Sequence, residues 1–138
     1  MTDPDVLADQ VLPLDGPHTA DSIVAGTELL AQLVRRLNHA VRDTDLDDPR
    51  DVHRVFADLH LTARGLTLLC DLLAIDVGAL DRPDVYASSG APTAAAVAEA
   101  ASAMSAAGQC AATVTGHLKA GRDATARLGI HEPDTERE

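Results

Sequence analysis

The residues with the clearest potential for chemistry are three alternating aspartates, Asp43, Asp45 and Asp47. Oxygen ligands at every second position can converge on one hard cation such as Ca²⁺, because alternate side chains of a loop point to the same side. Asp51 adds a fourth carboxylate four residues further on. The same residues suit a solvated acidic turn between two helices. We expect this turn, and weak divalent-cation binding by the three alternating aspartates is the alternative.

The run resembles the opening of an EF-hand calcium loop over its first few residues. Further along, Asp48 stands where that loop needs its turning glycine, and Arg54 stands where it needs a bidentate glutamate. The resemblance therefore implies only the first ligands of a calcium site. We expect no cofactor.

Histidines are the second group that could bind a metal, and the chain has six. His53 and His60 are seven residues apart, which places them on one side of a predicted helix. A di-metal helical bundle needs Glu-x-x-His pairs from two helices. The chain has none, and Glu28 and Glu99 are the only glutamates in its predicted helices. We expect the histidines to flank the core and to be partly exposed.

The nucleophilic side chains show no catalytic pattern. Cys70 and Cys110 are best interpreted as small buried hydrophobic residues, and Asp71 beside Cys70 disfavours a reactive thiolate. Ser88-Ser89-Gly90 has no nucleophile-elbow surroundings, and the chain has no phosphate-binding glycine loop. We expect no catalytic residue and no enzymatic activity.

Composition excludes further functions for this chain of 138 residues, which has a net charge of −11, one Tyr, one Phe and no Trp. Phosphate backbones and anionic membranes attract clustered Lys and Arg, so direct binding to nucleic acid or to a membrane is not expected. No apolar run approaches the roughly 18 residues of a membrane span. Met1 to Asp5 are acidic, where a secretory signal would be basic. We expect a cytoplasmic protein.

The apolar spacing predicts helices throughout. Pro4 and Pro13 bound a short helical stretch within an arm at residues 1–18. Residues 19–42 and 49–75 have apolar side chains alternately four and three apart, and Asp48-Pro49 is a strong start for the second of these helices. A third, alanine-rich helix is predicted from Thr93 to Leu128. The predicted inner stripes are Ile23, Thr27, Leu30, Val34, Leu37 and Val41 in the first long helix, Val52, Phe56, Leu59, Ala63, Leu66, Cys70 and Leu73 in the second, and Val97, Ala101, Met104, Gly108, Ala111, Val114 and Leu118 in the third.

The second long helix also has a further apolar stripe, formed by Leu61, Leu68, Leu72 and Ile75. It lies on roughly the opposite side of the helix from the inner stripe. One antiparallel neighbour cannot cover both stripes. We expect these four residues to form an interface between copies of the chain.

These patterns predict an all-α fold, a helical bundle of three long helices with a short N-terminal helical arm. The two helices that flank residues 43–48 are expected to form an antiparallel hairpin, with the alanine-rich helix as the third. The domains expected are the arm at 1–18, the bundle at 19–129 with a loop at 76–92, and a loose charged tail at 130–138. A small acidic helical hairpin is similar in shape to the substrates of type VII secretion. However, their Trp-x-Gly turn is absent, and Gly90 stands at the acidic position of their tail signal.

The sequence alone therefore predicts a non-catalytic helical interaction or scaffold protein that self-associates, most simply as a homodimer. The near absence of charge between Thr93 and Leu118, where Glu99 is the only charged residue, also favours association. One alternative is a small helical bundle that binds a metal ion or a small ligand. Another is an acidic regulator that binds a basic protein partner.

Overall fold

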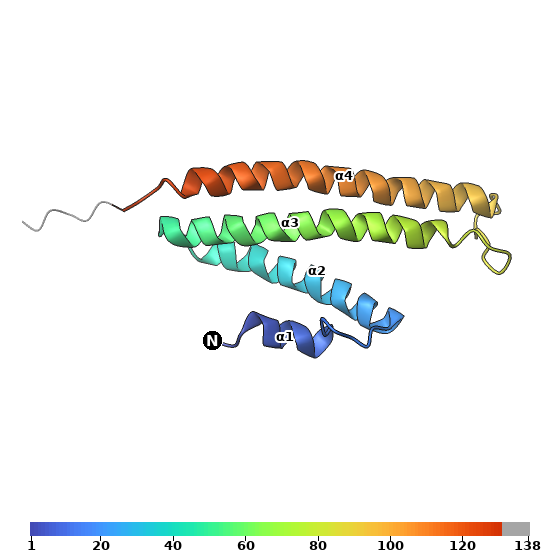
Figure 1. Cartoon of the computed structure of the whole chain (residues 1–138), viewed down its shortest axis with the longest axis horizontal. Helices are drawn as coiled ribbons and strands as arrows, with labels where there is room; N and C mark the ends of the chain where they lie inside the picture. Colours follow the sequence, from blue (N-terminus) through green and yellow to red (C-terminus); the bar gives the residue numbers. More distant parts are fainter. Residues whose placement is uncertain (131–138) are drawn as a thin grey trace, which may run out of the picture. The chain divides into compact units, whose positions relative to one another are not determined.

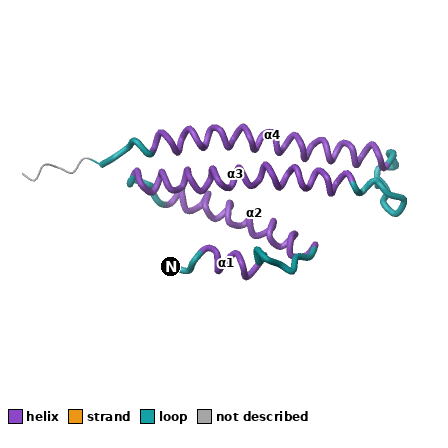
Figure 2. The backbone as a smooth tube through the Cα atoms, in the orientation of Figure 1, coloured by secondary structure: helices purple, strands orange, loops and turns teal. Residues whose placement is uncertain are grey.

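A computed structural model describes residues 1–130, and these form helices without any strand (Figures 1 and 2). The expected all-α fold, with three long helices and a short N-terminal one, is confirmed. Residues 131–138, most of the predicted charged tail, lie outside the described residues. The four helices are α1 (Pro4–Val11), α2 (Ala20–Asp43), α3 (Pro49–Gly78) and α4 (Thr93–Thr125).

The chain divides into two compact units, and the first comprises residues 1–46 with helices α1 and α2. A capping box starts α2: the Ser22 backbone N–H donates to Thr19 Oγ1 over 3.1 Å, and Ser22 Oγ accepts from the Thr19 N–H over 2.9 Å. Leu12, just after α1, reaches Gly26 of α2, where an added Cβ would lie 3.3 Å from Leu12 Cδ2. No residue of α2 is buried, so its apolar stripe is largely uncovered.

The second unit starts at Asp47, and its described part is an antiparallel hairpin of α3 and α4 (Figure 1). As the sequence predicted, Asp48 caps α3 by accepting the Arg50 backbone N–H over 2.8 Å, and Pro49 occupies the first helical position. Helix α3 continues to Gly78, so the loop spans residues 79–92 rather than 76–92. In the loop, Tyr86 is 83% exposed. The structure thus shows an antiparallel hairpin formed by α3 and α4, which are joined by the loop at residues 79–92.

The contact surface between α3 and α4, here called the seam, is lined mainly by small and polar side chains. Ala63 is 5% exposed, His60 is 9% exposed, and Gly108 is also buried. The α3 residues of the seam follow an alternating spacing of three and four. They are His53, Phe56, His60, Ala63, Thr67, Cys70, Ala74 and Val77.

The predicted inner stripe of α3 is correct at Phe56, Ala63 and Cys70, and at its other four positions the seam residue is the next one along the chain. Leu59 is 42% exposed, and Leu66 and Leu73 lie half-buried beside the seam. The backbone of Gly108 approaches α3 so closely that an added Cβ would lie only 3.2 Å from Cys70 Cβ. A leucine does not fit between backbones at this separation, so the large side chains occupy the flanks.

The predicted stripe of α4 is confirmed from Val97 to Ala111 and again at Leu118. Between Ala111 and Leu118 the covered residue differs from the prediction: Val114 is 48% exposed, and Thr115 is half-buried in its place. The predicted stripe takes two consecutive steps of three, from Gly108 to Ala111 and on to Val114, whereas the covered residues keep alternating steps of four and three. One step of four replaces a step of three, and this restores the contact.

Candidate functional site: an apolar flank of helix α3

The structure places the four residues of the predicted interface together on one side of α3. Leu61 is 60% exposed, Leu68 61%, Leu72 52% and Ile75 70%. We call this group the α3 stripe. Its spacing of seven, four and three keeps the side chains in line along the helix, beside the seam and not within it. Helix α4 leaves the stripe uncovered.

The sequence analysis did not identify two further features of the stripe. Arg64 and Gly65 lie between Leu61 and Leu68 on the same side of the helix. No atom of a neighbouring element lies within 4 Å of the position that a Cβ of Gly65 would occupy, so the backbone is open to close approach there. Helical spacing, applied to small and charged residues as well as to apolar ones, would have identified both.

The alternating aspartates form no metal centre in the described part of the chain. Asp43 is the last residue of α2, while Asp45 and Asp47 follow it in the connection, and all three are exposed. Within residues 1–130, no group of three or more His, Cys, Asp or Glu side chains is placed to hold a metal ion.

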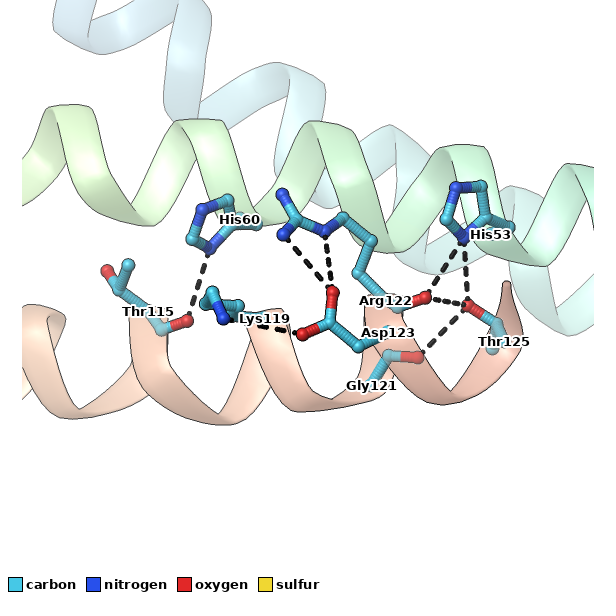
Figure 3. Close-up of polar contacts among 8 residues, drawn as sticks. All are labelled: His53, His60, Thr115, Lys119, Gly121, Arg122, Asp123 and Thr125. Atoms are coloured by element: carbon cyan, nitrogen blue, oxygen red, sulfur yellow. Dashed lines mark hydrogen bonds and ion pairs between the residues drawn. The ribbon is translucent and has the colours of Figure 1, made fainter. Parts of the chain in front are cut away.

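The two histidines of α3 have a structural role that the sequence analysis did not anticipate (Figure 3). His53 Nδ1–H donates to the Arg122 carbonyl oxygen over 3.0 Å and to Thr125 Oγ1 over 3.2 Å. His60 Nδ1–H donates to the Thr115 carbonyl oxygen over 3.2 Å. The expectation of partly exposed, flanking histidines is wrong for His60, which is buried in the seam. Both rings link α3 to the backbone of α4.

The cysteines also differ from expectation. Cys70 is half-buried in the seam beside Gly108, as expected of a small hydrophobic residue, whereas Cys110 is exposed. Both are free thiols.

Ion pairs near the open end of the hairpin lower the pKa values of two carboxylates, Asp48 and Asp123. The Arg50 guanidinium donates to Asp48 over 2.7 Å, and this hydrogen bond holds the pKa of Asp48 below its ordinary value. Asp123 lies between Arg122 and Lys119, and the hydrogen bond from Arg122 lowers its pKa (Figure 3). Both pairs are on the surface, where such contacts contribute little to stability.

The hollows of the surface do not resemble a ligand site. A mainly apolar one, at the loop end of the hairpin, has a volume of about 160 Å³ and is lined by residues including Val77, Tyr86 and Val97. Sites for small molecules usually have about 300–1,000 Å³ and a few convergent polar groups. A hollow of about 410 Å³ at the open end is lined by residues 48–50 and 128–130, most of them exposed.

None of the helices in the described residues is long and apolar enough to cross a membrane. The α3 stripe is therefore the site best supported by these observations. Comparisons with protein-family models, with curated proteins and with solved structures find no match to this chain.

Proposed function

We propose that this protein is a non-catalytic interaction protein that self-associates through the α3 stripe, most simply as a homodimer. The observation that carries the proposal is the exposure of four large apolar side chains in line on α3, between 52% and 70% each. Scattered exposed leucines are ordinary, but a contiguous apolar surface on a small protein marks an interaction site.

The free energy gained by burying the stripe is large enough to allow association. Full burial of a Leu or Ile side chain stabilises by about 1.5–3 kcal/mol. Because the four side chains are already partly covered, burial of the remainder contributes roughly 1–2 kcal/mol each. A two-fold interface would bury eight of them, a gain of about 8–16 kcal/mol, which is comparable to the estimated cost of association of about 4–15 kcal/mol.

Light scattering after size exclusion, at two protein concentrations about tenfold apart, tests the proposal. We expect a mass of about twice 14.4 kDa for the natural chain. Leu68→Asp should give a monomer with unchanged helix content, because it places a charge in the centre of the buried surface. The matched control is Val114→Asp, which changes a residue that is 48% exposed on α4 outside the stripe and should leave the dimer intact.

Two results would overturn the proposal. A monomer at both concentrations would mean that another part of the chain covers the stripe. A dimer that survives Leu68→Asp would place the interface elsewhere. A cytoplasmic location is also part of the proposal, supported by the two free cysteines and the acidic composition.

A further inference from the structure

The two halves of the hairpin differ in charge. The open-end half, residues 47–64 and 115–130, has six Lys or Arg side chains and five acidic ones. The loop-end half, residues 65–114, has one basic side chain, Arg82, and five acidic ones. The hairpin is therefore nearly balanced at its open end and strongly acidic at its loop end.

A similar asymmetry is present beside the α3 stripe. Arg54, Asp58 and Arg64 lie along its open-end half, with a net charge of +1, whereas Asp71 and Asp76 lie along its loop-end half, with a net charge of −2. In a parallel pairing of two stripes the two acidic halves would lie side by side, so that like charges would come close together. In an antiparallel pairing the acidic half of one chain would face the half with the arginines in the other, which is the complementary arrangement.

We infer that the partner on the α3 stripe is a second copy of this chain, bound antiparallel about a two-fold axis near Leu68. This inference rests on the self-association proposed above and adds the orientation and register of the two chains. Residues whose numbers sum to about 136 then lie opposite each other. Leu68 meets the partner's Leu68, and Leu61 meets the partner's Ile75.

Arg64 then lies opposite the partner's Asp71, and the two-fold axis repeats this pair. Both residues lie on the edge of the stripe nearer to α4. In an antiparallel pair of helices, this edge of one stripe lies beside the same edge of the partner's stripe. Gly65 falls near the centre of the interface, where its missing side chain lets the two backbones approach.

Cysteine cross-linking tests the register in full-length chains with Cys70→Ala and Cys110→Ser. A disulfide needs Cα atoms within about 7 Å, so it reports on residues directly opposite each other. Leu68→Cys should cross-link to itself under mild oxidation. Leu61→Cys and Ile75→Cys should each cross-link poorly alone, and their equimolar mixture should give about tenfold more covalent dimer.

A parallel register predicts the reverse pattern, because Leu61→Cys and Ile75→Cys would then each cross-link to themselves. That pattern, in chains that light scattering shows to be dimers when reduced, would overturn the inference and leave self-association standing. Dimers with no cross-link at any of the three positions would also overturn it. Reduced chains that are monomeric would overturn both proposals.

The charge pairs supply an independent test. Arg64→Glu should raise the dissociation constant about tenfold at low salt, because it replaces two attractive pairs by two repulsive ones. The effect should shrink in 0.5 M NaCl, where the screening length is only a few ångströms. Arg127→Glu, a basic residue after α4 and away from the stripe, is the control and should leave the constant unchanged. An equal effect of the two variants would contradict the assignment of Arg64 to the interface.

Discussion

Of the glycines in the hairpin, Gly121 of α4 is the one most closely covered by the opposite helix, by the ring of Phe56 of α3. A Cβ added to Gly121 would overlap the ring, at 2.7 Å from Phe56 Cδ1 and 2.9 Å from Cζ. Gly121→Ala therefore forces the ring of the chain's only phenylalanine away from α4. Elsewhere in α4, Gly116 has no atom of a neighbouring element within 4 Å of the same position and provides a matched control.

Two opposing effects determine how much Gly121→Ala changes the free energy of unfolding. Replacement of glycine by alanine within a helix stabilises by about 1 kcal/mol, and Gly116→Ala should show this gain alone. Overpacking at a close contact costs about 1–3 kcal/mol. Since the helix propensity term is common to both variants, Gly121→Ala should be less stable than Gly116→Ala by about 1–3 kcal/mol.

Urea unfolding followed by far-UV circular dichroism, at one fixed protein concentration, measures this difference. Adding Phe56→Ala to both variants should remove most of this difference, because the new Cβ at position 121 overlaps the Phe56 ring. If Gly121→Ala is as stable as Gly116→Ala, or if the difference persists without the ring, Phe56 does not pack closely against Gly121.

Two further predictions concern the seam and its charged end. His60→Ala should lower the free energy of unfolding by roughly 1–3 kcal/mol, because it removes a buried ring and its hydrogen bond to Thr115. His117→Ala, at an exposed position of α4, should change it by less than about 0.5 kcal/mol in the same urea titration. The lowered pKa values of Asp48 and Asp123 predict a contribution to stability that is complete well above pH 3.8 and is lost as the pH falls below 3.8 through their folded-state values. Asp123→Asn should reduce the loss of stability between pH 5 and pH 3, and an unchanged loss would contradict the assigned ion pair.

The helix boundaries were largely predictable because they depend on local chemistry. Asp48-Pro49 starts α3 as expected, and Pro13 and Thr19 bound the short helix and α2. The end of α3 was placed three residues early, since Asp76 was assigned to the loop whereas the helix continues to Gly78.

The face that α3 presents to α4 was only partly predictable from hydropathy, which placed Phe56, Ala63 and Cys70 correctly. The rule that the most apolar stripe lies inside favours Leu59, Leu66 and Leu73, but the distance between the helices is set by Gly108 and its small neighbours on α4. Only small or flat side chains fit at that distance, so the buried positions include Ala63 and His60. The feature that decides this face is the partner helix, which the periodicity of α3 alone does not contain.

The α3 stripe was found from the sequence because it depends only on residue type and helical spacing. Our proposal for its partner and orientation needed the structure, since the contrast between Arg64 and Asp71 gains meaning once the hairpin separates an open end from a loop end.

The small side chains of the seam also affect how the protein behaves in a cell. Among the described residues, Ala63 is the only buried hydrophobic one, so the hairpin removes little apolar surface from water by itself. On our proposal the rest is covered by another copy, which binds the folded chain and not the unfolded one, and folding is then coupled to assembly by mass action. Abundant protein is consequently more folded than scarce protein. Since cellular proteases degrade unfolded chains, the lifetime of each molecule would increase with the amount of the protein that the cell makes.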